Sequence, residues 1–125
     1  MWVAMNDSFV SIVQDRLLAD GLVVRARVKE DLIAFMPDIE EDKIIETEDS
    51  DYRFRVFTSK EDVAYLISDR VMDIHYDNFK NSVKETWRST AYLKIWMIMN
   101  TVQETIYGSP WTNYRAYWLP GKGDR

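Results

Sequence analysis

The sequence contains no cysteine, and this absence removes several classes of protein at once. A chain without thiols has no disulfides, no cysteine-ligated zinc or iron–sulfur centre and no thiol nucleophile. It also needs no oxidising compartment, so we expect a cytoplasmic location. Glycine is scarce, with four residues, and neither a glycine-rich phosphate loop nor a Gly-x-Ser-x-Gly nucleophile elbow is present.

Long apolar runs are missing as well. The longest lies around residues 95–102, ends before Glu104, and is shorter than the roughly 18 apolar residues that a transmembrane helix requires. The first residues carry no basic stretch and reach an acid at Asp7, which argues against a secretory signal. We therefore expect no membrane partner.

Charge is plentiful but unevenly distributed. The net charge is −5, yet residues 38–51 hold eight carboxylates and one lysine, a net charge of −7, while the remainder sums to +2. Such a segment favours basic partners and disfavours non-specific nucleic-acid binding, although a merely solubilising loop would have the same composition. The candidate partner-binding carboxylates are Glu40, Glu41, Asp42, Glu46, Glu48 and Asp49.

Hydrophobic periodicity predicts the elements of the fold. Residues 2–5 with 9–13, and 43–48 with 52–57, predict two hairpins, and 22–28 alternates as a half-buried strand. Helices are predicted over 30–36, from 58 or 59 to 74, near 79 and over 89–107. The fold class is therefore α+β, a two-layer sandwich in which about four antiparallel strands carry three helices mostly on one face. A ferredoxin-like arrangement is one candidate. We expect one domain over 1–107 and an aromatic-rich extension over 108–125.

Four arginines occur in two pairs with i, i+2 spacing, which places each pair on one face of a strand. They are Arg25, Arg27, Arg53 and Arg55. An exposed basic sheet face of this kind is how RNA-recognition modules hold single strands. The competing interpretation, which we favour here, is a ladder of cross-strand ion pairs with Glu46 and Glu48 of the neighbouring strand.

The single histidine, His75, lies between Asp73 and Asp77, a spacing that would suit two carboxylates and an imidazole around a metal ion. A full site needs further ligands that the sequence does not mark. A small hydrolase or metal-dependent enzyme is therefore the third alternative, and we expect neither enzymatic activity nor a cofactor.

The end of the chain concentrates large aromatic side chains within eight residues. They are Trp111, Tyr114, Tyr117 and Trp118. Monomers rarely leave such a group in water, so these residues either fold back over the helices or anchor a partner or a second copy.

Several segments carry a recognisable pattern: Met1-Trp2 with Met5-Asn6, 9–13, 23–27, 51–55 and the run 76–83. With these motifs the sequence resembles a family of short uncharacterised bacterial and phage-associated proteins. Proteins carried by phages and mobile elements often bind and block host machinery. The resemblance thus suggests a non-enzymatic protein-interaction module, an anti-CRISPR-like inhibitor of host defence whose target has a basic surface. A nucleic-acid-binding module that uses the arginine face is the first alternative, and a homodimer is a further one.

Overall fold

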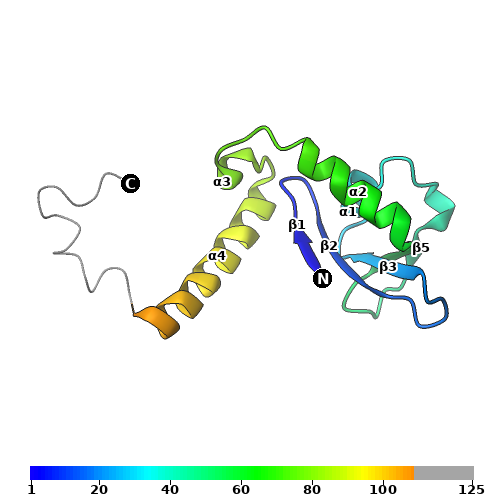
Figure 1. The fold of residues 1–125 in the computed structure, drawn as a ribbon, viewed down its shortest axis with the longest axis horizontal. Coiled ribbons are helices and arrows are strands. Elements are labelled where there is room, and N and C mark those ends of the chain that lie inside the picture. Colours follow the sequence, from blue (N-terminus) through cyan, green and yellow to red (C-terminus); the bar gives the residue numbers. More distant parts are fainter. Residues whose placement is uncertain (109–125) are drawn as a thin grey trace, which may run out of the picture. The chain divides into compact units, whose positions relative to one another are not determined.

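The computed structural model describes residues 1–108, which form an α+β fold of five antiparallel strands and four helices (Figure 1). The strands are β1 (Trp2–Ala4), β2 (Phe9–Gln14), β3 (Gly21–Ala26), β4 (Ile45–Glu46) and β5 (Phe54–Ser59). The helices are α1 (Lys29–Phe35), α2 (Lys60–Met72), α3 (Phe79–Ser82) and α4 (Thr86–Tyr107), and a 3₁₀ turn covers Glu41–Lys43. The predicted fold class is confirmed, with one strand more than expected.

The strands follow the order β1-β2-β3-β5-β4, and every neighbouring pair is antiparallel. Tight turns join β1, β2 and β3 into consecutive hairpins. In the second turn a Cβ at Gly21 would lie 3.0 Å from the Cβ atoms of Asp15 and Leu18, closer than side chains normally approach, so the path of the chain favours glycine there. This order differs from the ferredoxin-like candidate, whose elements follow the order β-α-β-β-α-β. Here the first three strands follow one another with no helix between them.

The core lies on one face of the sheet, where alternate residues of the three longest strands point inward. Val10, Val24 and Val56 are at most 1% exposed. Helix α1 adds Leu32 and Phe35 to this core. Helix α2 packs against the same core through Val63, Leu66 and Ile67. Each large apolar side chain buried in this way contributes about 1.5–3 kcal/mol.

The second predicted hairpin is shorter than the alternation indicated. Strand β4 has two residues, because Glu41–Lys43 is a 3₁₀ turn, and β5 begins at Phe54. Tyr52 precedes β5, so the alternation of the strand does not reach it. Its ring is buried, but it lies beside arginines and outside the apolar core cluster.

The chain divides into two compact units, Met1–Lys84 and a second that begins at Glu85, whereas the sequence suggested a boundary at 107/108. The described part of the second unit is α4, which ends at Tyr107 and is followed by Gly108 with φ of +83°. A positive φ of this size is accessible mainly to glycine, because glycine has no Cβ. Within residues 1–108, no helix combines the length and apolar character needed to cross a membrane.

Candidate anion-binding face of the sheet

The face of the sheet opposite the core carries a row of side chains across all five strands. The register aligns Trp2 with Ser11, Ser11 with Arg25, Arg25 with Arg55, and Arg55 with Ile45. Side chains alternate along a strand, and the neighbours of Arg25 and Arg55 in sequence belong to the core. Helices α1 and α2 both pack on the core side (Figure 1), so within residues 1–84 neither of them covers this row.

Arg25 and Arg55 lie directly opposite one another in the middle of the row. The Arg25 Nη2 donates to the Oγ of Ser11 at 2.7 Å, and the Arg55 Nη2 donates to the Oγ of Ser50 at 2.7 Å. Arg55 also reaches the carbonyl oxygen of Tyr52 at 3.4 Å. Both side chains are partly exposed. Neutral hydroxyl and carbonyl groups therefore orient the two guanidinium groups without neutralising them.

Tyr52 brings a third guanidinium into the cluster. The Cζ atoms of Arg25 and Arg27 lie 4.5 Å and 4.3 Å from the centroid of the Tyr52 ring. A cation over an aromatic face at this distance is attracted by the ring by about 0.5–2 kcal/mol. We call Arg25, Arg27, Arg55 and Tyr52 the arginine cluster. Sequence reasoning missed the role of Tyr52, because the Tyr-x-x-Arg spacing of Tyr52 and Arg55 gives no signal of a contact with Arg25 on another strand.

Arg53 has a different role from the other three arginines. Its Nε donates to the Oε1 of Glu46 at 2.7 Å, and its Nη2 lies 3.3 Å from the Oε1 of Glu48. The ion-pair ladder that the sequence predicted is thus confirmed at Arg53. At Arg25, Arg27 and Arg55 it is absent among the described residues, where no carboxylate forms an ion pair with them.

The electrostatics of the cluster are unfavourable in the isolated chain. Like charges directly opposite on neighbouring strands destabilise a sheet. The Nε atoms of Arg25 and Arg55 are buried and find no hydrogen-bond partner within residues 1–108. A buried donor left unpaired costs about 1–3 kcal/mol. An anion placed over the exposed guanidinium nitrogens would offset the charge repulsion, so the cluster is suited to binding carboxylate or phosphate oxygens.

Exposed aromatic rings flank the cluster on the same face. Phe57, two residues beyond Arg55 on β5, is 52% exposed. Trp2, at the far end of the row, is 68% exposed and packs edge-on against Phe9 with ring centroids 5.7 Å apart. The face thus combines positive charge with apolar rings that remain accessible.

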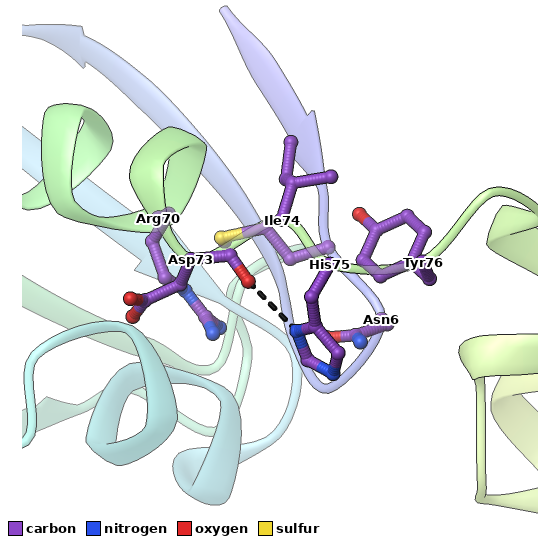
Figure 2. Close-up of a pocket in the computed structure, with 7 residues that line it drawn as sticks. Asn6, Arg70, Asp73, Ile74, His75 and Tyr76 are labelled. Atoms are coloured by element: carbon purple, nitrogen blue, oxygen red, sulfur yellow. Dashed lines mark hydrogen bonds between the residues drawn. The ribbon is translucent and has the colours of Figure 1, made fainter.

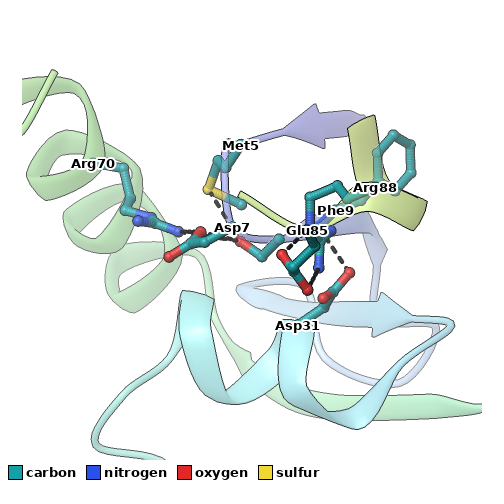
Figure 3. A network of polar contacts seen from close by, with 8 residues as sticks. Met5, Asp7, Phe9, Asp31, Arg70, Glu85 and Arg88 are labelled. Carbon is teal, nitrogen blue, oxygen red and sulfur yellow. Dashed lines mark hydrogen bonds and ion pairs between the residues drawn. The ribbon is translucent and has the colours of Figure 1, made fainter. Parts of the chain in front are cut away.

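A separate polar network ties the β1–β2 turn to α2 (Figure 3). Arg70 of α2 donates to the carboxylate of Asp7 and, at 3.1 Å, to the Oγ of Ser8. Burial raises the pKa of Asp7, but the hydrogen bond and charge of Arg70 outweigh this effect and hold that pKa below its ordinary value of 3.8. Asp31 of α1, 3% exposed, accepts from the backbone N–H of Phe9 at 3.0 Å. Nothing in the sequence marks Asp31 as this buried acceptor.

A pocket of about 370 Å³ lies where α2 ends beside the β1–β2 turn, and it contains His75 (Figure 2). The His75 Nδ1 is 2.9 Å from the carbonyl oxygen of Asp73, which suits a proton on Nδ1. Arg70 also lines this pocket but is engaged by Asp7. In the part of the chain that the structure describes, no three histidine, aspartate or glutamate side chains gather closely enough to hold a metal ion.

The acidic segment, residues 38–51, is largely exposed, and its six candidate carboxylates are all exposed. Glu41 pairs with Lys29 at 2.6 Å, which raises the pKa of Lys29 and lowers that of Glu41. Glu40, Asp42 and Asp49 form no ion pair among the described residues.

The four aromatic candidates at the end of the chain lie outside the described residues, which end at Gly108. No protein-family model, curated protein or solved structure matches this chain.

Proposed function

We propose that the protein is a non-enzymatic binding module whose open sheet face takes the phosphate backbone of a single-stranded nucleic acid. The observation that carries the proposal is the arginine cluster: Arg25 and Arg27 lie over the Tyr52 ring, and Arg55 lies opposite Arg25. None of these three arginines forms an ion pair with a carboxylate among the described residues. Guanidinium groups present paired N–H donors that match the oxygens of a phosphate.

The cluster is held in place before any ligand arrives. Ser11 and Ser50 fix the ends of Arg25 and Arg55, and the Tyr52 ring supports Arg25 and Arg27. Ordering a long side chain on binding otherwise costs about 0.5–1.5 kcal/mol. These contacts therefore favour affinity by reducing that cost.

A single strand suits this face better than a duplex. Unpaired bases are free to stack on exposed rings, and such stacking is worth about 1–3 kcal/mol per base. Phe57 lies two residues from Arg55 along β5, roughly 7 Å by strand geometry. A phosphate on the arginine cluster would thus leave an adjacent base within reach of the Phe57 ring.

The test is binding of a fluorescently labelled single-stranded RNA oligonucleotide, measured by anisotropy across a salt series. Three phosphate contacts predict a slope of log affinity against log salt of about −2. The double variant Arg25→Gln with Arg55→Gln should lower affinity and reduce the magnitude of the slope by about 1.4, because two contacts are lost.

Arg53 supplies a matched control, because Arg53→Gln removes a positive charge from the same sheet but one already paired with Glu46 and Glu48. We expect Arg53→Gln to weaken RNA binding much less than Arg55→Gln does. Equal losses of RNA affinity in Arg53→Gln and Arg55→Gln would show that net charge, and not the arginine cluster, determines binding. The absence of RNA binding at low salt would refute the proposal.

The acidic segment supports a second proposal, binding of a basic protein surface. Its exposed carboxylates at Glu40, Asp42 and Asp49 have no ion-pair partner in the described chain. Clustered carboxylates offer a charge density similar to that of nucleic-acid phosphates, so a groove for nucleic acid on a host defence protein would be a suitable target. Affinity capture from host lysate, lost when these three residues are changed to the corresponding amides, would support it; a complex indifferent to the change would not.

A further inference from the structure

Helix α4 exposes apolar side chains along its whole length. Within residues 86–107 the only charged side chains are Arg88, Lys94 and Glu104. The exposed large apolar residues of its middle and last turns are Leu93, Ile95, Trp96, Met97, Ile98, Met99, Val102, Ile106 and Tyr107. A helix that is apolar on most of its surface is normally buried against protein.

One stripe on α4 has the spacing of a helix that pairs with another helix. Ile95, Met99, Val102 and Ile106 follow steps of four, three and four residues, the a/d pattern of a heptad. They are 42%, 59%, 46% and 65% exposed, and Ile98 beside them is 66% exposed. The stripe is therefore accessible and continuous over about three turns.

We propose that this stripe is the contact between two copies of the chain, with the two α4 helices antiparallel. In that arrangement Ile95 of one copy meets Ile106 of the other, and Met99 meets Val102. The four positions then form four complete layers that use every residue of the stripe on both copies. A self-complementary set of this kind is what a two-fold interface requires, because the same surface serves both sides.

The helix dipoles favour the antiparallel direction, because the partly positive N-terminal end of each α4 then lies beside the partly negative C-terminal end of the other. The charged side chains do not decide the direction, since Glu104 lies on the side of α4 opposite the stripe.

The available area is at the lower limit for a specific dimer. Aromatic side chains bury roughly 150–250 Å², and the isoleucine, methionine and valine side chains here are smaller, so the four stripe residues and Ile98 at about half exposure leave on the order of 500 Å² or less per copy. Two copies would bury up to about 1,000 Å², the smallest size expected of a biological interface, so we expect a weak dimer. The pairing is independent of the arginine cluster, which lies in the other unit.

The experiment is sedimentation equilibrium of the full chain, with a pair of matched variants. Met99→Lys places a charge in the stripe, and Met97→Lys places the same charge on the opposite side of α4 at a nearly equal exposure of 56% against 59%. We expect a dimer whose Kd rises by about 30-fold or more in Met99→Lys and is nearly unchanged in Met97→Lys. Equal effects of the two variants, or a wild-type chain that is monomeric at every concentration, would overturn the proposal.

The direction is tested independently by disulfide formation, since the chain has no cysteine of its own. A mixture of Ile95→Cys and Ile106→Cys chains should form the mixed disulfide, and each variant alone should cross-link poorly. Efficient cross-linking of Ile95→Cys with itself would show a parallel pair. This measurement keeps the proposal falsifiable if Met99→Lys fails to fold, because both cysteine variants preserve an uncharged stripe.

Discussion

The contacts of individual side chains decide which arginines of the open sheet face are paired with a carboxylate, and residue type alone does not. Arg53 and Arg55 are two positions apart and carry the same charge, but Arg53 is neutralised by Glu46 and Glu48. Arg55 faces Arg25 and finds only neutral acceptors. The capacity to hold an anion thus follows from the partner that each guanidinium has in the fold.

The contact between Asp7 and Arg70 predicts a specific response to acid. Because the folded pKa of Asp7 is lowered, its contribution to stability is complete above the unfolded pKa of about 3.9 and is lost as pH falls through the folded value. The Asp7 side chain is 48% exposed, so we expect a contribution of about 1 kcal/mol or less.

Urea denaturation of the wild type and Asp7→Asn at a series of pH values measures this contribution. We expect the wild type to be more stable at pH of about 6, and the difference to shrink as pH falls below about 4. A difference that stays constant over this range would show that the Asp7 charge does not stabilise the fold.

Among the secondary-structure elements, the start of α2 shows how the structure selects between two caps that the sequence left open. Thr58 with Glu61 and Ser59 with Asp62 are both capping patterns. In the fold both residues belong to β5, where Thr58 pairs with Leu22 and Ser59 with Gly21. Helix α2 begins at Lys60, so Ser59 is the N-cap, and its Oγ accepts from the Asp62 N–H at 3.1 Å.

The selected cap predicts unequal effects of two substitutions. Ser59→Ala should destabilise the protein by about 1 kcal/mol, because the Asp62 N–H loses its acceptor. Thr58→Val removes the other hydroxyl while keeping a β-branched side chain in β5, and should change stability by about 0.5 kcal/mol or less. Thermal melting of the two variants makes the comparison. A larger loss from Thr58→Val would mean that the Ser59 cap contributes little.

The sequence predicted elements well where a local pattern persists over six or more residues. The alternation of 22–28 placed Val24 and Ala26 in the core, and the stripe of 63–74 marked α2. It could not predict the surroundings of Tyr52, because residues 51–53 precede β5 and their contacts depend on the register with β3. The same register decides which arginines contact glutamates. The spacing therefore pointed to all four arginines, but it could not show that Arg53 is paired with Glu46 and Glu48 while the other three are not.

For the molecule as a whole, a strongly acidic segment and an arginine cluster occur in the same unit. If the cluster binds phosphates as proposed, the net charge of −5 would repel nucleic acid at a distance while the cluster attracts phosphates at close range. The combination would then suppress non-specific adsorption and retain binding where a ligand fits the face. Glu46 and Glu48 belong to the acidic segment, and they neutralise Arg53, the arginine nearest to that segment in the sequence.

Neutralising part of the acidic segment tests this balance. Changing Glu40, Glu41, Asp42 and Glu48 to the corresponding amides should alter stability by less than about 1 kcal/mol per residue, because these side chains are exposed. The affinity for single-stranded RNA should rise and its association should become faster at low salt. Melting curves and stopped-flow binding give the two quantities. An unchanged association rate would mean that the segment does not influence approach to the cluster.

The strand order has a consequence for how quickly the chain reaches its native state. Strands β1, β2 and β3 pair through short turns, whereas β3 must find β5 across residues 27–53, which include the whole acidic segment. Closing a long loop costs entropy before any contact repays it, and sequence-distant pairing slows folding. We expect the three-stranded meander to form first and the docking of β5 to limit the refolding rate. Shortening this loop should therefore accelerate refolding more than it slows unfolding.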